Sequence, residues 1–182
     1  PKILEEIFDA CGRNLHREVE LVRLDPQYSL VFESGGDIQA TPNVERMKQQ
    51  IAKISPPDAA NFEAFINDNR RKFEAFAPIL QSPFNGIMDA VSPDLFKMLP
   101  LVRPWASVDG DLKRYFKDPR IRLAFSFQSK YLGMSPMRCP SLFTILSYLE
   151  YDYGVYHPTG GCGEVSRAMA RVARELGVDI RL

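Results

Sequence analysis

The chain has 182 residues, and its 23 lysines and arginines balance 23 aspartates and glutamates, so the formal net charge is zero. This balance excludes the basic footprint of a nucleic-acid-binding domain, and we expect no nucleic-acid partner. The three cysteines are widely spaced and outside any C-x-x-C pair, and the two histidines lie far apart, so we expect reduced thiols and no bound metal. The length predicts one domain with a substantial core.

Neither a membrane-spanning helix nor a signal peptide is predicted. The longest uncharged runs, residues 75–88 and 139–149, fall short of the roughly 20 apolar residues that cross a bilayer. The chain starts at Pro1 without a methionine and stops inside an alternating apolar segment, residues 178–182, that predicts a strand. We therefore expect a fragment of a longer, cytoplasmic protein.

The first part of the chain predicts a helix, a strand patch and a second helix. Apolar residues at helical spacing predict a helix over residues 3–11, which Gly12 ends. Three segments have strand-forming composition and predict a two- or three-stranded antiparallel patch, residues 19–24, 28–33 and 38–41. Asn43 is the predicted N-cap of the next helix, whose apolar face is formed by Val44, Met47, Ile51 and Ile54.

A phenylalanine-rich helix is predicted next. Ser55 is its predicted N-cap, and Asp58 stands at the capping-box position. One side of the helix carries apolar residues, namely Phe62, Phe65, Ile66, Phe73 and Phe76. The other side is predicted to face water and carries Asn67, Asp68, Arg70, Arg71 and Lys72.

Residues 75–118 are predicted to form a helical, oily sub-region. Five prolines divide its first part, residues 75–105, which is rich in apolar side chains and poor in charge. One interpretation is a set of short helices that close the core, because apolar spacing usually marks a core. The other is an edge that touches a membrane or admits a ligand, because irregular apolar helices ending in Trp, Lys and Arg suit a bilayer interface. Both interpretations stay open on the sequence.

The last part of the chain predicts three helices and a short strand. Asp118 is the predicted N-cap of a helix that Gly133 ends. The following helix, up to Gly154, is apolar nearly all round. A strand over residues 155–157 leads through a glycine turn into an amphipathic helix that ends at Gly177. Together these elements predict an α+β fold with helices packed on a small antiparallel sheet.

The glycine turn is compared with the motif that binds dinucleotides. Its pattern, Gly161-x-Gly163-x-x-Ser166, is close to the G-x-G-x-x-G motif, which places a phosphate at a helix N-terminus. Arg181 stands where an acidic ribose partner would be expected. A plain tight turn is therefore the preferred interpretation.

Hydrolase chemistry is not supported, because the chain has no G-x-S-x-G motif. Glu150 and Asp152 do not share a helix face at a spacing of two, and we expect both to be solvated charges at a helix end. The many aromatic residues between 125 and 156 predict a core or, as a functional site, a long apolar slot for a hydrocarbon.

The most distinctive segments of the chain are RLAFSFQ (122–128), YLGMSP (131–136), YLEY (148–151) and GVYHPTGG (154–161). These segments resemble the bacterial phytoene desaturases and related carotenoid desaturases. The opening of the chain resembles the region that follows the N-terminal flavin motif of that family, so the resemblance covers nearly all 182 residues. In residues 75–105 it rests only on the oily, proline-broken character.

The resemblance implies a two-domain, FAD-dependent flavoprotein whose FAD-binding segments lie mainly outside this chain. Residues 1–182 would be its substrate-binding and membrane-facing region, inactive alone and peripheral to the inner face of the membrane. This region would hold phytoene or a related linear polyene precursor while hydride passes to the flavin. The alternatives are another flavin amine-oxidase-like oxidoreductase acting on an apolar substrate, and a non-catalytic lipid-binding module.

The resemblance also implies roles for individual residues. The substrate tunnel would be lined by Phe125, Phe127, Gln128, Tyr131 and Tyr148. The end of the tunnel near the flavin ring would be formed by Tyr156, Pro158, Gly160 and Gly161. An acidic catalytic helper has been proposed for the family, and Asp89 is the nearest candidate here.

Overall fold

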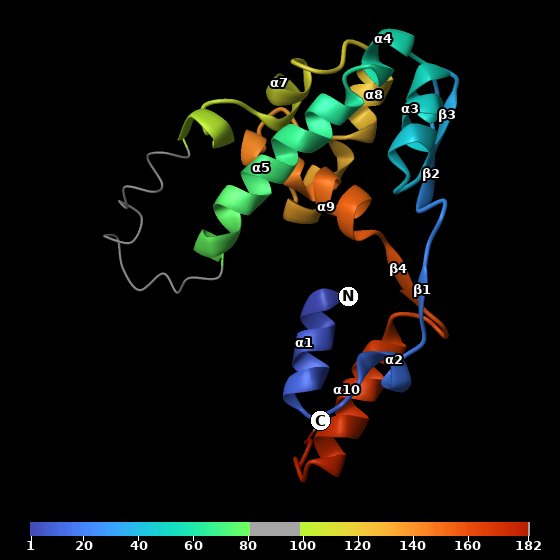
Figure 1. Ribbon diagram of the computed structural model, residues 1–182, viewed down its shortest axis with the longest axis vertical. Coiled ribbons are helices and arrows are strands. Elements are labelled where there is room, and N and C mark those ends of the chain that lie inside the picture. The colour runs from blue at the N-terminus through green and yellow to red at the C-terminus, as the bar shows by residue number, and fades with distance from the viewer. Residues whose placement is uncertain (81–98, 182) are drawn as a thin grey trace.

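The computed structural model describes residues 1–80 and 99–181, which form helices and two short antiparallel strand pairs (Figure 1). The predicted α+β class is therefore confirmed, with the strands in two separate pairs. The chain divides into a terminal unit, a connecting strand pair and a larger helical body. Of the predicted oily sub-region, residues 81–98 lie outside the described part.

The terminal unit contains the helices from the two ends of the chain: α1 (Lys2–Ala10), α2 (Leu15–Glu18) and α10 (Gly163–Glu175). Their shared core consists of Phe8, Leu15, Val19, Ala168 and Val172. Gly12 follows α1 with a φ of +67°, as its predicted stop position requires. Residues 178–181 form no strand, which corrects the strand predicted at this end, because an alternating pattern does not supply the partner that a strand needs.

The connecting strand pair consists of β1 (Leu21–Arg23) and β4 (Tyr156–Pro158), with Val22 opposite His157. The predicted patch placed β1 beside its neighbours in sequence, whereas the structure pairs it with a strand near the other end of the chain. Two further backbone hydrogen bonds extend this pair: the Leu24 amide donates to Val155 and the Thr159 amide donates to Glu20, each at 2.9 Å. Strand composition predicts that a segment pairs but does not identify its partner.

The helical body begins with a hairpin of β2 (Tyr28–Val31) and β3 (Asp37–Ala40), which α3 (Val44–Ala52) covers (Figure 1). Ile38, Met47 and Ile51 are fully buried between the hairpin and the helix. Asn43 caps α3 as predicted, because its side-chain oxygen accepts a hydrogen bond from the Arg46 amide at 2.9 Å.

The next elements are α4 (Pro56–Ala59) and the long α5 (Phe62–Leu80). The Ser55 side chain does not cap α4, so the predicted capping box is wrong. The fully buried Asp58 carboxylate instead accepts hydrogen bonds from the amides of Lys117 and Asp118, at 2.9 and 2.8 Å. These two hydrogen bonds from a distant loop compensate the Asp58 carboxylate for the water that it loses on burial.

The remaining elements are a helical turn at residues 99–102, α7 (Val108–Leu112), α8 (Pro119–Ala124), η2 (Phe127–Leu132), η3 (Ser141–Thr144) and α9 (Ile145–Tyr153). Asp118 caps α8 as predicted, accepting from the Arg120 amide at 2.8 Å. The helix predicted up to Gly133 is divided into α8 and the 3₁₀ helix η2. At the division the carbonyl oxygen of Phe125 accepts a hydrogen bond from Ser147 Oγ at 2.8 Å, which gives this carbonyl a partner outside the helix.

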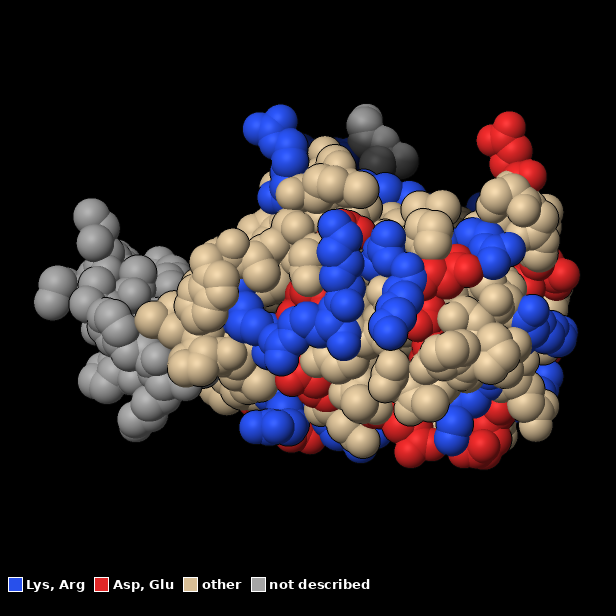
Figure 2. All heavy atoms as spheres, turned by 90° about the horizontal axis from the view of Figure 1, so that it is seen from above, with Lys and Arg blue, Asp and Glu red and all other residues tan. Residues whose placement is uncertain are grey.

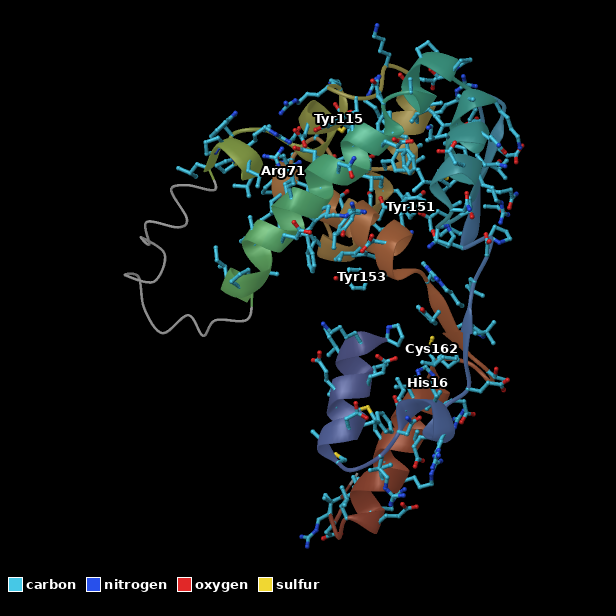
Figure 3. All side chains as sticks on the ribbon, in the orientation of Figure 1. His16, Arg71, Tyr115, Tyr151, Tyr153 and Cys162 are labelled. Atoms are coloured by element: carbon cyan, nitrogen blue, oxygen red, sulfur yellow. The ribbon has the colours of Figure 1, made fainter. Side chains whose placement is uncertain are left out.

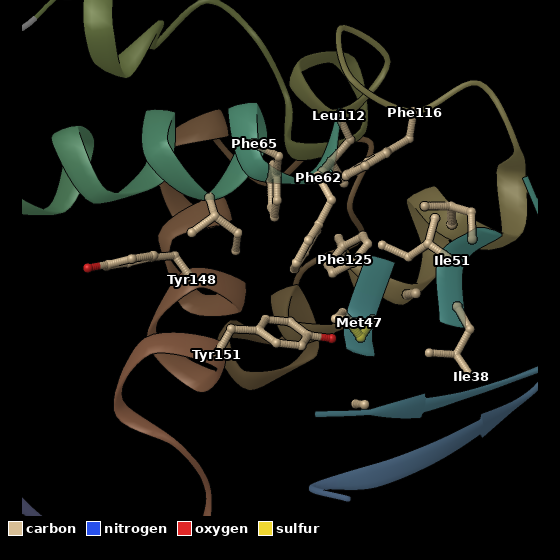
Figure 4. Packing of buried hydrophobic residues seen from close by; sticks show 14 of the residues in the cluster. Ile38, Met47, Ile51, Phe62, Phe65, Leu112, Phe116, Phe125, Tyr148 and Tyr151 are labelled. Carbon is tan, nitrogen blue, oxygen red and sulfur yellow. The ribbon is translucent and has the colours of Figure 1, made fainter. Parts of the chain in front are cut away.

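The core of the helical body is a group of interleaved aromatic rings between α5, α7, α8 and α9 (Figure 4). Phe62 and Phe65 enter it from α5, which confirms the predicted phenylalanine stripe. Their rings lie 5.6 and 5.2 Å from the ring of Phe125, and the Phe116 ring is stacked on Phe125 at 5.0 Å. Such contacts add directional stabilisation to the burial of apolar surface.

The described helices do not include one with the length and hydropathy needed to cross a bilayer. On the face drawn in Figure 2, basic and acidic side chains lie interspersed among other residues. This distribution agrees with the balanced charge of the sequence.

Candidate functional site

The predicted tunnel residues lie on α8, η2 and α9, or directly beside them, but the structure gives them different environments. Phe125 is 1% exposed and is surrounded by the rings of Phe62, Phe65, Phe116 and Tyr151, so it is part of the aromatic core. Its predicted contact with a substrate stays a prediction. In the described chain, its role is to hold the end of α8 against α5 and α9.

Tyr148 is also buried, at 3% exposure, on the α9 face toward α5. Its ring lies 6.1 Å from the Phe73 ring, and the Arg70 guanidinium lies 6.0 Å from the ring centre. In Figure 4 its hydroxyl points away from the aromatic core. Burial raises the pKa of the Tyr148 hydroxyl, which therefore stays protonated at neutral pH.

Three other side chains converge on the carboxylate of Glu150, and we call these four residues the Glu150 cluster. Tyr28 donates to Glu150 Oε2 at 2.8 Å, Gln128 Nε2 donates to the same oxygen at 2.8 Å, and Tyr131 donates to Oε1 at 3.2 Å. Ser147 Oγ lies within hydrogen-bonding distance of Gln128 Oε1, at 3.0 Å, and this contact orients the Gln128 amide. The cluster thus joins β2, η2 and α9.

The Glu150 cluster corrects one expectation from the sequence. Glu150 was expected to be a solvated charge, but its carboxylate is partly buried and accepts from three side chains, whereas Asp152 is exposed as expected. Burial raises the pKa of the Tyr28 hydroxyl, and the interactions with Tyr151 and Glu150 raise it further. Burial first, and then the Glu150 charge, also raise the pKa of Tyr131. Both hydroxyls are therefore donors, and Glu150 orients its neighbours as an acceptor.

The outer side of η2 leaves two predicted site residues accessible. Tyr131 is 62% exposed, and Phe127 is partly exposed. The Phe127 ring meets Tyr28 edge-on at 5.5 Å, while the Lys130 ammonium lies 4.7 Å from the centre of the Phe127 ring. Among the predicted tunnel residues, the rings on η2 are thus the ones that solvent, or a ligand, reaches in this chain.

The residues predicted to lie near the flavin sit on β4 and the following turn, away from the aromatic core. Tyr156 pairs with Arg23, and Pro158 is buried opposite Leu21. Gly160 and Gly161 have φ values of +88° and +95°, which L-residues rarely adopt. The first role of the two glycines is therefore structural: they let the chain turn from β4 into α10.

The same turn allows a test of which part of FAD these residues could hold. A Cβ at Gly160 would lie 3.0 Å from the Glu164 side chain, whereas nothing lies within 4 Å of one at Gly161. A hydrogen bond from Arg167 lowers the pKa of Glu164, so a negative charge stands at the start of α10. The open space beside Gly161 leaves room for a flat ring against the backbone, whereas at the start of α10 the Glu164 carboxylate and the Arg167 guanidinium pair with each other.

A buried ion network links α5 to the chain that follows residue 98, and it contains Lys72, Arg103, Asp68 and Asp111. Lys72 Nζ lies 2.6 Å from Asp111 Oδ2 and 3.2 Å from Asp68 Oδ2. Arg103 binds the same two carboxylates, Asp111 Oδ1 at 2.7 Å and Asp68 Oδ2 at 2.5 Å. Lys72 is fully buried, so the expectation that it faces water is wrong. The Arg114 guanidinium also lies 3.6 Å from Asp111 Oδ1 at the exposed edge of the network, so two carboxylates face three cations.

Asp68 makes stability depend on pH. Burial by itself raises the pKa of this carboxyl, but hydrogen bonds from Tyr115 and Arg103 and the charge of Lys72 outweigh burial and lower the pKa below its ordinary value. A lowered carboxyl pKa contributes stability above the ordinary pKa, and this contribution disappears as the pH falls through the folded value. We expect the stability difference between the native protein and Asp68→Asn, measured by urea unfolding, to shrink as the pH falls from about 5 through the ordinary carboxyl pKa toward the lower folded value. A difference that stays constant over this range would contradict the assignment.

Asp89, the candidate acidic helper, lies outside the described residues. The sequence reasoning missed the Glu150 cluster and the ion network. Both could have been suspected from the polar residues that interrupt apolar helical segments. In sequence alone, however, such residues cannot be told from those of a solvent-exposed helix face.

No family model matches the chain. It is 38% identical over 180 residues to the 4,4'-diapophytoene desaturase (4,4'-diapolycopene-forming) of a Methylomonas species, which covers 99% of this chain and 35% of that protein. It is 31% identical to the zeta-carotene-forming phytoene desaturase of Myxococcus xanthus, over 98% of this chain and 35% of the relative. It is also 31% identical to the phytoene desaturase (lycopene-forming) of Pantoea ananas, over the whole of this chain and 37% of the relative.

These comparisons confirm the resemblance drawn from the motifs. Along nearly its whole length, the chain is related to the phytoene and carotenoid desaturases. The chain spans about a third of the length of the curated relatives it matches, in agreement with the expectation of a longer parent protein.

Proposed function

We propose that residues 1–182 form the substrate-binding and membrane-facing region of an FAD-dependent carotenoid desaturase. The observation that carries this proposal is the similarity to carotenoid desaturases over 98–100% of the chain. The names of these relatives differ in substrate or product, but each describes the desaturation of phytoene or 4,4'-diapophytoene. The substrate class proposed here is therefore phytoene or a related linear polyene precursor.

In this proposal FAD, held mainly by segments outside residues 1–182, supplies hydride acceptance when bound. The residues of this chain bind and orient the hydrocarbon and exclude water. The exposed rings of Phe127 and Tyr131 contribute apolar surface, and the Glu150 cluster fixes η2, which carries them. Tyr156, Pro158 and Gly161 lie toward the flavin, where the open backbone face of Gly161 admits a flat ring.

The test uses the complete parent protein. We expect it to purify with a flavin absorbance spectrum and to convert phytoene or 4,4'-diapophytoene into coloured polyenes when a quinone or another electron acceptor is present. A flavin spectrum with turnover of another apolar substrate alone would instead support the amine-oxidase-like alternative. A colourless protein that binds lipid without turnover would support the lipid-binding module.

The Gln128 amide offers a sharper test within the same protein. Its contacts with Glu150 and Ser147 hold η2 on α9, so Gln128→Leu should disturb the placement of Phe127 and Tyr131. We expect the KM of this variant for the polyene to rise by a larger factor than the factor by which the flavin bound per protein falls. Loss of flavin at unchanged KM would contradict a role on the substrate side.

We also propose that the oily sub-region makes peripheral contact with the inner face of the membrane. Trp105 is 73% exposed and Leu99 is 37% exposed, beside the part of the chain where apolar residues are densest. Large exposed apolar side chains of this kind bind at the boundary between headgroups and acyl chains.

Replacing Trp105 and Leu99 by glutamate is therefore expected to release the parent protein from liposomes in a sedimentation assay. The expected loss is several-fold in the membrane-bound fraction, because burial of apolar area is removed and two charges are added. Val31→Glu is the control, since Val31 is 83% exposed on the hairpin of the helical body, far from Trp105 in sequence. Unchanged sedimentation of the double variant would contradict the proposed contact.

A further inference from the structure

An apolar groove with a volume of about 250 Å³ lies between α1 and α10 in the terminal unit. Its lining includes Ile7 and Cys11 at the α1 side and Met169, Leu176 and Val178 at the α10 side. Ile7, Met169, Leu176 and Val178 are each 41–55% exposed. Apolar side chains gathered on one uncovered surface indicate an interface that is incomplete in this chain.

Besides the face buried in the core of the terminal unit, the helices that form the groove have apolar side chains that remain exposed. On α1, Phe8 is buried against α2 and α10, whereas Ile3 and Ile7 are 74% and 42% exposed. Among the described residues, the core of the terminal unit contains five buried apolar side chains. Short helices with so small a core depend on further packing for their stability.

Ion pairs outside the groove hold its walls in place. Arg171 Nη2 lies 2.6 Å from Glu18 Oε2, which fastens α10 to α2, and Arg13 pairs with Glu175 beyond the end of α1. These pairs join cations to carboxylates, and none of their residues lines the groove. The ion pairs therefore hold the helices that form the groove, and its lining contains none of the lysines and arginines that would favour an anionic bilayer.

The length of the relatives indicates what covers the groove. In Figure 1 both ends of the chain lie at the terminal unit, and Val178, close to the last described residue, lines the groove. Figure 3 shows His16 and Cys162 on this unit, separate from Arg71 and the labelled tyrosines of the helical body. The chain covers 35% of two curated relatives, so about two thirds of a protein of their length lies outside the matched region and is available to cover the groove.

We propose that the groove between α1 and α10 is the docking surface for the part of the parent polypeptide outside residues 1–182. An attached segment meets this surface at high effective concentration, which favours it over a second copy of the chain. Residues 178–181 carry apolar side chains at alternate positions and begin at the groove, so this end of the chain packs with the docked part. The inference rests on the longer parent and does not require desaturase activity.

The experiment measures thiol labelling in the intact parent protein. Cys11 already lines the groove, and Ile7→Cys and Leu176→Cys place two more reporters there. Val31→Cys is the matched control, because Val31 is an exposed apolar residue on the helical body. Each thiol is reacted with N-ethylmaleimide, and the labelling rate of its peptide is followed by mass spectrometry.

We expect the three groove thiols to react at least about tenfold more slowly than the control thiol, and to reach its rate when the protein is unfolded in urea. Equal rates in the native parent would overturn the proposal. Protection that appears only at high protein concentration would assign the groove to a second copy and overturn it. Protection that appears only after addition of anionic vesicles would assign the groove to a membrane and equally overturn it.

A charge substitution gives a second readout. Ile7→Asp should lower the thermal midpoint of the parent protein, whereas Val31→Asp should leave it unchanged, because only Ile7 would be covered. Since neither measurement uses a substrate, an inactive parent protein with protected thiols would refute the proposed function and leave the docking surface standing.

Discussion

Replacing Lys72 by alanine is expected to lower the free energy of unfolding by about 3–5 kcal/mol, because it leaves the buried Asp111 carboxylate without its closest cation. Asp111 is 1% exposed, so water cannot replace the lost ammonium without opening the core. Arg103 still contacts Asp111 at 2.7 Å, and this contact limits the loss. Urea unfolding of the native and variant proteins measures the difference.

The control for this prediction lies two positions earlier on the same helix. Arg70 is 45% exposed and pairs with Asp152 at 3.5 Å, so Arg70→Ala should cost about 0–1 kcal/mol. A double-mutant cycle with Asp111→Ala separates the ion pair from the packing of the lysine stem. Additive effects of the two substitutions would contradict a direct coupling between Lys72 and Asp111.

Replacing Phe125 by alanine should also cost about 3–5 kcal/mol, through loss of a fully buried ring and the cavity that it leaves. The reason is the contact of this ring with four other aromatic rings, at centre distances between 5.0 and 5.7 Å. Thermal and urea unfolding measure the loss. Because the substitution opens the core, we expect the proposed desaturase activity of the parent protein to fall together with its stability.

Leu123→Ala is the matched control, since Leu123 lies on α8 just before Phe125 and is 53% exposed. Its expected effect is within about 0.5 kcal/mol. If Phe125→Ala altered turnover of the polyene while leaving the unfolding curve unchanged, the ring would be a tunnel wall and its assignment to the core would be wrong. Tyr131, which is largely exposed, is better placed to report on substrate contact alone.

The candidate site was only partly predictable. The motifs that carry the family resemblance identified η2, α9 and the β4 turn, and the comparisons confirm that resemblance. The motifs did not distinguish Phe125, which the core encloses, from Tyr131, which is 62% exposed. What separates the two rings is the packing around each of them: four aromatic rings from other elements surround Phe125, whereas no element covers Tyr131 on the outer side of η2 in the described chain.

Some features of this protein follow from local sequence. Asn43 and Asp118 cap the helices that they were predicted to cap, because an N-cap depends only on a side chain and amides two or three residues away. Gly12 and Gly133 end their helices with positive φ for a similarly local reason. The phenylalanine stripe on α5 was also predicted, since helical periodicity places its members on one face.

Only the tertiary structure decided which charged residues are buried and which strands pair. Lys72 meets Asp111, 39 residues later, and Tyr28 meets Glu150, 122 residues later. Sequence periodicity reports the face of one element, whereas burial of a charge depends on an opposite charge or donor supplied by a distant element. The same reason explains why β1 pairs with β4: strand composition is local, but the partner is set by the packing of the whole chain.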